Sequence, residues 1–361
     1  MFKQTSRLMA VFLTLLLLLF PLGCMKKQVK PDTNNTPPAP AQQQADPAKK
    51  LVIGYYENPW PGTPASTGSF PALQNYHDEM TGIAPYWYTV QGNGSIASKE
   101  SQQVIDFAKS KNLKMYALVI NKHDESDAIL NNPQIRTAAI ANLVKLVQEK
   151  QVDGINIDFE LLKPEHKDGL NAFMAELYPQ LKKLNKTVII SVFPKVDIAS
   201  DVTSAYDYPT LAKNVDYLQI MAYDQHWGTA KPGPIAAIDW VEKNLKEAVD
   251  QTGSPQKIIL GVPAYGYDWP DQEGSKAETV TYTQAVDRAE KKGAKIEWDD
   301  ASQVPHYKYA SHEVWFENAE SAKPKLDLVK KYNIAGIAIW RLGQEDPKLW
   351  DVIANMIKLI K

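Results

Sequence analysis

The sequence of 361 residues lacks most of the residue patterns that metal and cofactor chemistry require. Its single cysteine excludes an intramolecular disulfide framework and any cysteine-rich zinc or iron–sulfur site. Its six histidines are scattered, without the paired spacing of a metal-binding helix. Neither a phosphate-binding glycine-rich loop nor a Gly-x-Ser-x-Gly motif is present. We therefore expect a protein that works without a metal or another cofactor.

An excess of charge of one sign is also missing. Forty Lys and Arg against 42 Asp and Glu leave a net charge of -2 at pH 7. A nucleic-acid-binding protein needs a strongly basic surface. The composition thus argues against a nucleic-acid partner, while 44% hydrophobic residues are enough for a sizeable core.

The N-terminus carries an apolar stretch over residues 8–20, which follows Lys3 and Arg7. The stretch is shorter than the roughly 20 residues that a membrane-spanning helix needs, so it predicts a signal peptide over residues 1–24. It ends in Leu22-Gly23-Cys24, which resembles a bacterial lipobox, whose cysteine is lipid-modified and becomes the first mature residue. We expect an extracytoplasmic protein held at the cell membrane through Cys24. Ordinary secretion and an uncleaved anchor are the alternatives.

Residues 25–50 are rich in Pro, Gln, Asn and Ala and poor in large apolar side chains. Such a segment buries too little surface to offset the entropy of ordering, so we expect a linker here. The folded body then spans residues 51–361. Its length exceeds the roughly 250 residues that a bare eight-stranded barrel needs.

The body alternates short β-rich apolar runs with amphipathic stretches, which is typical of a parallel sheet with crossover helices. Helical spacing of apolar residues is clearest over 101–111, 135–150 and 170–184. The apolar runs are 51–56, 82–88, 114–120, 154–159, 187–193, 217–223, 257–262 and 334–340. Eight strand-then-helix repeats predict an α/β fold of the (β/α)8 barrel type, with an open doubly wound sheet as the alternative.

The extra length lies between the last two apolar runs. This region contains a helical stretch over 283–292 and β-like runs over 295–298 and 313–316. We therefore expect a small α+β insertion over about 266–324, between strands seven and eight of the barrel.

The strongest chemical signal is the sequence Asp-Gly-Ile-Asn-Ile-Asp-Phe-Glu at residues 153–160. Alternate residues of a strand share one face, so Asn156, Asp158 and Glu160 are expected to point into the barrel. Burial and mutual repulsion raise the pKa of one of two adjacent carboxyl groups, which keeps an acid protonated for catalysis. The alternative is an ion cluster in the barrel core.

These residues resemble glycoside hydrolase family 18, the chitinase-like family, whose signature is Asp-x-x-Asp-x-Asp-x-Glu at the end of the fourth strand. Asp153, Asp158 and Glu160 match it, and Asn156 replaces the middle Asp. The family's Met-x-Tyr-Asp element, at the end of strand six, stands at residues 221–224, and its strand-eight tryptophan is Trp340. The Asn-containing signature and the stretch at 312–317 resemble the bacterial branch that includes spore-cortex and cell-wall glucosaminidases.

The resemblance implies hydrolysis of β-1,4 bonds next to N-acetylglucosamine in peptidoglycan or chitin-like glycans. Because the substrate's own N-acetyl oxygen attacks the anomeric carbon in this family, the two-carboxylate scheme of other glycosidases does not apply. Glu160 would be the acid and base, Asp158 would hold the N-acetyl N–H, and Tyr223 would donate to the acetamido oxygen. A monomer is expected, and a non-catalytic glycan-binding lectin on the same barrel is the alternative function.

The resemblance also implies a set of substrate-binding residues. Trp340 would form an apolar floor under the sugar ring, and Asp224 would contact sugar hydroxyls or the acid. Asn156 is expected to orient Asp158 by a hydrogen bond. The further candidates around the cleft are Gln219, Met221, Tyr265 and Glu57.

Overall fold

The computed structural model describes residues 49–64, 67–272 and 274–360, and within them eight parallel strands close into a ring. The first strand pairs on one side with the second and on the other side with the last. This double pairing excludes an open sheet and confirms the predicted (β/α)8 barrel. In ring order the strands are β1 (Leu51–Tyr56), β2 (Gly82–Val90), β4 (Lys114–Asn121), β5 (Gly154–Asp158), β6 (Thr187–Val192), β7 (Tyr217–Ile220), β8 (Ile258–Pro263) and β14 (Gly336–Trp340). A short strand, β3 (Ile96–Ser98), runs antiparallel to β2.

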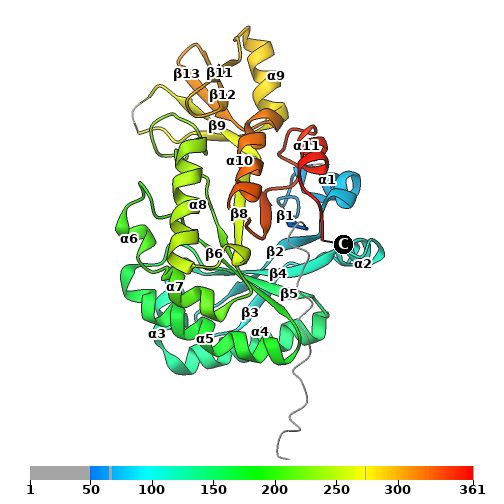
Figure 1. Cartoon of the computed structure of the whole chain (residues 1–361), viewed down its shortest axis with the longest axis vertical. Helices are drawn as coiled ribbons and strands as arrows, with labels where there is room; N and C mark the ends of the chain where they lie inside the picture. Colours follow the sequence, from blue (N-terminus) through cyan, green and yellow to red (C-terminus); the bar gives the residue numbers. More distant parts are fainter. Residues whose placement is uncertain (1–48, 65–66, 273, 361) are drawn as a thin grey trace, which may run out of the picture. The chain divides into compact units, whose positions relative to one another are not determined.

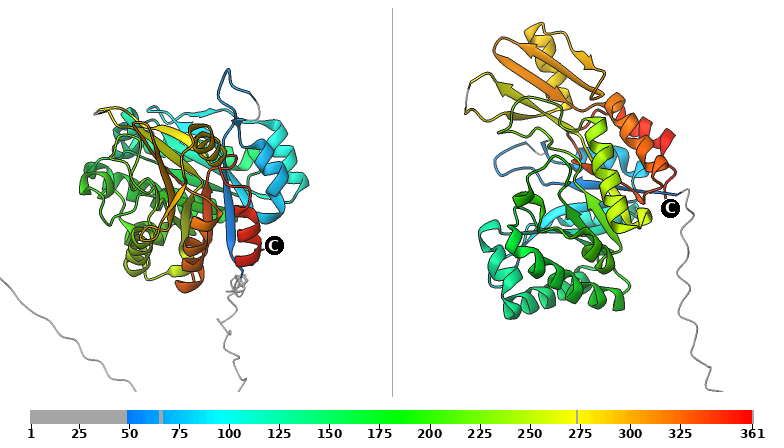
Figure 2. Two further views of the ribbon diagram at one scale, coloured as in Figure 1. Left: turned by 90° about the horizontal axis from the view of Figure 1, so that it is seen from above. Right: turned by 60° about the vertical axis from the view of Figure 1, so that its left-hand side comes forward.

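Helices follow the strands and cover the outside of the barrel (Figures 1 and 2). The helix α4 begins at Pro133, where the Asn132 side chain accepts hydrogen bonds from two backbone N–H groups, and it buries a stripe at three- and four-residue spacing. The barrel helices are α1 (Phe70–Tyr76), α2 (Gln102–Ser110), α3 (Ser126–Asn131), α4 (Pro133–Lys150), α5 (Lys167–Lys183), α6 (Ser200–Thr203), α7 (Tyr208–Leu211), α8 (Ile238–Thr252), α10 (Ala319–Lys331) and α11 (Leu349–Met356). The three helices predicted from spacing correspond to α2, α4 and α5.

The predicted signal peptide with Cys24, and the linker up to residue 48, lie outside the described residues. In the part of the chain that is described, no helix combines the length and the apolar character that crossing a membrane would take.

An antiparallel sheet of five strands lies between β8 and α10, which confirms the predicted α+β insertion. Its strands are β9 (Tyr265–Pro270), β10 (Glu278–Thr281), β11 (Glu297–Asp299), β12 (Val304–Tyr309) and β13 (His312–Phe316). The helix α9 (Tyr282–Lys292) packs on this sheet through Ala285 and Ala289, which meet Tyr307 and Phe316. Figure 1 shows the insertion, in yellow and orange, at the top of the view, with α4 and α5 at the bottom. The sheet ends at Phe316, so the expected boundary at residue 324 falls inside the barrel helix α10.

A buried ion pair joins the end of the insertion to α10. The Lys325 ammonium lies 2.8 Å from the Glu317 carboxylate, and the two side chains are 1% and 3% exposed. The Ser321 hydroxyl donates to the same Glu317 oxygen at 2.6 Å. Two charges buried in this way depend on each other, because the loss of one leaves the other without compensation.

Lys325→Met is therefore expected to lower the free energy of unfolding by about 3 to 5 kcal/mol. The matched control is Lys323→Met on the same helix, which removes an exposed pair with Glu320 and should change stability by only about 0 to 1 kcal/mol. Urea unfolding followed by circular dichroism measures both. Equal midpoints for the two variants would show that the buried pair does not stabilise the fold.

Candidate active site

The end of β5 brings the two predicted acids to the mouth of the barrel. Asn156 and Asp158 are buried in the barrel interior, where Asp158 is 5% exposed, and Glu160 follows two residues after the strand ends. The Oδ1 atom of Asp158 is buried without a hydrogen-bond partner among the described residues. A buried carboxylate oxygen without a partner is costly, so this atom is available to a donor on a bound substrate.

Both acids have pKa values above their ordinary range. Burial raises the pKa of Asp158, and the Ser191 hydroxyl opposes this rise. Burial also raises the pKa of Glu160, and the negative charges of Asp158 and Asp224 raise it further. Desolvation thus raises the pKa of both acids, and repulsion between like charges adds to the rise for Glu160. At least one proton is therefore retained by this pair closer to neutral pH than ordinary carboxyl groups would allow.

Asn121, at the end of β4, holds the backbone of Glu160. Its side-chain oxygen accepts the Glu160 N–H at 2.8 Å, and its amide nitrogen donates to the Glu160 carbonyl at 2.9 Å. This residue was not predicted from the sequence. One feature of the sequence could have indicated it: Asn121 is a polar residue directly after the apolar run 114–120, and it is therefore expected at the same end of the sheet as Asp158.

Tyr223 and Asp224 lie in the turn that follows β7. The predicted run over 217–223 was too long, since β7 ends at Ile220 and the chain turns tightly, with backbone bonds from Ala222 N–H to Ile220 and from Tyr223 N–H to Met221. Asp224 has a φ of +58°, a left-handed conformation that directs the chain away from the strand. The turn therefore places both side chains at the barrel mouth instead of in the sheet.

Room for the Tyr223 ring is made by Gly261 of β8. A Cβ atom at residue 261 would lie 2.8 Å from the Tyr223 ring and 2.4 Å from the Gln219 amide nitrogen. Burial raises the pKa of Tyr223 well above its ordinary value, and the nearby acids add to this effect. The hydroxyl is therefore protonated at all physiological pH values and is a hydrogen-bond donor.

Asp224 accepts hydrogen bonds from two tyrosines of the insertion. The Tyr265 hydroxyl lies at 2.5 Å and the Tyr267 hydroxyl at 3.0 Å from the same carboxylate oxygen. Burial raises the pKa of Asp224, and these two donors oppose the rise. Tyr265 was predicted and Tyr267 was not, although alternate residues of β9 share one face. The insertion thus contributes directly to the electrostatics of the site.

Trp340, the last residue of β14, is half-buried at the barrel mouth. Its ring meets Tyr55 and Tyr86 edge-on, with centroid distances of 5.3 and 6.1 Å. These two contacts fix the indole ring, whose flat aromatic surface is of the kind that suits the C–H groups of a sugar.

The barrel interior below the acids contains a buried polar layer. The Tyr55 hydroxyl donates to Gln219 at 2.9 Å and lies 3.2 Å from the Ser191 hydroxyl. Asn156 also bonds Ser191, donating at 2.8 Å. The expected hydrogen bond from Asn156 to Asp158 was therefore wrong: Asn156 bonds Ser191 on the neighbouring strand β6, and the Ser191 hydroxyl is the group that lowers the pKa of Asp158. Gln219 and Met221 are buried as well.

Glu57, expected as a cleft residue, forms an ion pair with Arg341. The guanidinium Nε lies 2.8 Å from the carboxylate, and the side chains are nearly buried. Glu57 follows β1 and Arg341 follows β14, so the pair joins the first and last strands of the ring at the mouth of the barrel.

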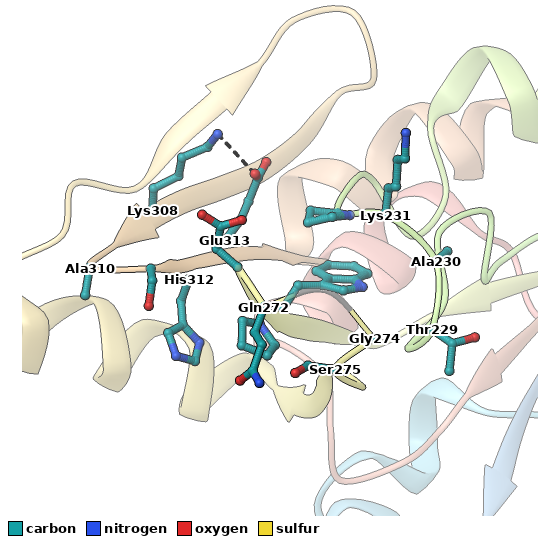
Figure 3. A pocket seen from close by; sticks show the side chains of 15 residues that line it. Thr229, Ala230, Lys231, Gln272, Gly274, Ser275, Lys308, Ala310, His312 and Glu313 are labelled. Atoms are coloured by element: carbon teal, nitrogen blue, oxygen red, sulfur yellow. Dashed lines mark ion pairs between the residues drawn. The ribbon is translucent and has the colours of Figure 1, made fainter.

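A pocket of about 600 Å³ lies at the outer end of the insertion sheet, where β9 ends and β12 turns into β13 (Figure 3). Lys308 and Glu313 form an ion pair of 3.0 Å at this pocket. None of the predicted site residues lines it. The pocket is therefore separate from the acids at the barrel mouth.

The described residues contain no group of three or more His, Cys, Asp and Glu side chains that is arranged to hold a metal ion. The site instead combines two carboxyl groups of raised pKa, a tyrosine donor and a half-buried indole ring. Such a set can protonate a leaving oxygen and activate water, which is general acid and base catalysis of hydrolysis.

Comparison with known proteins agrees with this chemistry. The family model for glycosyl hydrolases family 18 matches residues 41–345. The uncharacterized glycosylase YvbX of Bacillus subtilis is 29% identical over 326 residues, which cover 86% of this chain and 92% of that protein.

Two solved structures show the same similarity. The spore cortex-lytic enzyme SleL of Bacillus megaterium superposes with a TM-score of 0.79 at 26% identity, covering 87% of this chain and 75% of that one. A chitinase of Chromobacterium violaceum superposes with a TM-score of 0.76 at 28% identity, covering 84% of this chain and 98% of that one. The barrel, the site at its mouth and these matches agree, and the chain belongs to glycosyl hydrolases family 18 and is a glycosidase.

Proposed function

We propose that this glycosidase hydrolyses β-1,4 bonds next to N-acetylglucosamine, in peptidoglycan or a chitin-like glycan. The observation that carries the proposal is the Asp158 and Glu160 pair, in which both pKa values are raised and one Asp158 oxygen has no partner among the described residues. The relatives support the substrate class, since they include cortical fragment-lytic enzymes of Bacillus and a chitinase. A lectin would have no need of a protonated acid at the barrel mouth.

The proposed reaction uses the substrate's own N-acetyl group. Glu160 gives its proton to the glycosidic oxygen as the bond from that oxygen to the anomeric carbon breaks. The acetamido oxygen forms the new bond to the same carbon from the opposite face. Water then attacks this carbon while its bond to the acetamido oxygen breaks, which restores the N-acetyl group. The attacking water gives a proton to Glu160, so the acid is regenerated and the configuration is retained.

The neighbouring side chains stabilise the charge that develops. Asp158 accepts the acetamido N–H through its unpartnered oxygen and stabilises the positive oxazolinium. Tyr223 donates to the acetamido oxygen and orients it toward the anomeric carbon. Trp340 supports the sugar ring from below. Asp224, held by its two tyrosines, raises the pKa of Glu160 and so favours the protonated acid.

Substrate assistance predicts a strong dependence on the N-acetyl group. N-acetylglucosamine oligomers should be cleaved with retention of configuration, and their de-N-acetylated counterparts should react at least about 10³-fold more slowly, because the internal nucleophile is lost. Reducing-end assays give the rates, and proton NMR of the first product gives the anomer. Equal turnover of both substrates would contradict substrate assistance. Binding of both without cleavage would favour the lectin.

We also propose that the protein is extracytoplasmic and held at the membrane by a lipid on Cys24. The support is the short apolar stretch that ends in Leu22-Gly23-Cys24. Cys24→Ala should move the protein from the membrane fraction to the soluble fraction or block its processing, as seen by fractionation and the mass of the mature N-terminus. An unlipidated wild-type protein recovered in the medium would contradict the anchor and leave secretion.

A further inference from the structure

The strand that carries the two acids stops pairing before it reaches Glu160. The last pair between β4 and β5 is Ile120 with Asp158, and the last pair between β5 and β6 is Ile157 with Ile190. Glu160 lies two residues beyond the ladder with β4. A backbone segment in this position needs other partners for its N–H and C=O groups, or it is free to move.

Side chains supply those partners on both sides. Asn121 pairs with both backbone groups of Glu160 at 2.8 and 2.9 Å, so its amide replaces the peptide group that a longer β4 would provide. Tyr206 donates to the carbonyl of the preceding Phe159 at 2.7 Å. Leu161, directly after Glu160, has a φ of +52°, which turns the chain out of the strand direction. Glu160 is thus the last residue held in line with β5.

Asn121 is itself well fixed. It is 2% exposed, and its amide nitrogen also donates to the Ser126 hydroxyl at 2.6 Å. A side-chain amide has a donor and an acceptor in one plane, so two hydrogen bonds set both the place and the orientation of the backbone they contact. Alanine offers neither group, and aspartate at neutral pH offers only the acceptor.

We propose that Asn121 is the positioning residue of the proposed acid, and that its amide holds the Glu160 carboxyl where it can protonate the glycosidic oxygen. This inference rests on the proposed function of Glu160. It assigns Asn121 no contact with the substrate. A displacement of the acid by about 1 Å is enough to cost about 100-fold in rate, so the effect of losing the amide falls on kcat and not on substrate binding.

The same geometry affects the protonation of Glu160. Titratable groups face its carboxyl from β1, β2, β5, the segment before α7 and the turn after β7. They are Tyr55, Tyr86, Asp158, Tyr206, Tyr223 and Asp224. If the Glu160 carboxyl moved out of this surrounding, it would be more exposed to water and farther from the negative charges of Asp158 and Asp224, so its pKa would fall. A new carboxylate beside it would instead raise the pKa.

The test compares Asn121→Ala and Asn121→Asp with the wild type on N-acetylglucosamine oligomers across pH. Asn121→Ala should lower kcat about 100-fold with little change in KM, and the basic limb of its kcat/KM profile should move to lower pH. Asn121→Asp keeps one of the two hydrogen bonds, so its kcat should be intermediate, and its basic limb should move to higher pH. If Asn121 only stabilised the fold, the basic limbs of the two variants would not move in opposite directions.

Asn244 provides the matched control. It is 1% exposed and also holds backbone through its amide, accepting from Lys195 N–H and Val196 N–H at 2.8 and 2.7 Å. Asn244→Ala should lower the melting temperature as much as Asn121→Ala and leave the basic limb in place. Wild-type kcat and an unchanged pH profile for Asn121→Ala, alongside an inactive Glu160→Gln, would overturn this inference alone. An active Glu160→Gln would overturn the proposed function and this inference with it.

Discussion

Glu160→Gln is expected to lower kcat by about 10²- to 10⁴-fold on N-acetylglucosamine oligomers and on peptidoglycan, with the fold intact. Glutamine has the size of glutamate and leaves the backbone hydrogen bonds to Asn121 in place, but it has no acidic proton to give to the leaving oxygen. The measurement is the release of reducing ends. The control is Glu165→Gln, which changes an exposed glutamate in the short 3-10 helix Pro164–His166 after β5 and should retain wild-type activity.

The stability of Glu160→Gln gives a second, independent result. Burial and two negative neighbours raise the pKa of Glu160 in the folded protein, so the folded state binds this proton more tightly than the unfolded state. The wild type therefore loses stability as the pH rises from the unfolded pKa of about 4.3 through the raised folded pKa. Glutamine does not ionise and avoids this loss. The melting temperature of the variant should exceed that of the wild type increasingly over this range, and a constant difference would mean that Glu160 is not perturbed.

Asp158→Asn is expected to lower kcat by about 10²- to 10³-fold. The amide removes the negative charge that would stabilise the oxazolinium and replaces an acceptor for the acetamido N–H with a group that also donates. The change keeps the shape of the side chain in its buried position. Retention of more than a tenth of the wild-type kcat would show that Asp158 does not stabilise the transition state.

The pH profile of Asp158→Asn should shift in one definite direction relative to the wild type. The charge of Asp158 is one of the causes that raise the pKa of Glu160. Without it the pKa of Glu160 falls, so the acid loses its proton at lower pH and the basic limb of kcat/KM moves in the acidic direction. Measurement of initial rates between pH 4 and pH 9 tests this. A shift toward alkaline pH would contradict the electrostatic account of the pair.

Much of the fold followed from short-range patterns. Eight apolar runs at barrel spacing predicted the eight strands, because strands covered on both faces by other elements are continuously apolar. The extra length between the last two runs predicted the insertion. The alternation of Asn156, Asp158 and Glu160 placed them on one face of β5, where the structure has the first two buried in the barrel.

The contacts that could not be predicted join side chains of different strands. The partner of Asn156 is Ser191, which β6 contributes, and the partner of Glu57 is Arg341 at the far end of the chain. No local pattern specifies which of several polar side chains will meet inside a barrel. The same reason explains why Asn121 was missed, since its importance arises from Glu160 on the next strand.

The pairing of β1 with β14 has a consequence for how the enzyme matures. This contact joins residues near opposite ends of the folded body, and contacts of high sequence separation close late because they carry the largest loop entropy. Trp340 ends β14, the last barrel strand to be synthesised, and Arg341, the partner of Glu57, follows it directly. A partly synthesised chain therefore lacks Trp340, the residue proposed to support the sugar ring. Hydrolytic activity can begin only once translation of the barrel is complete.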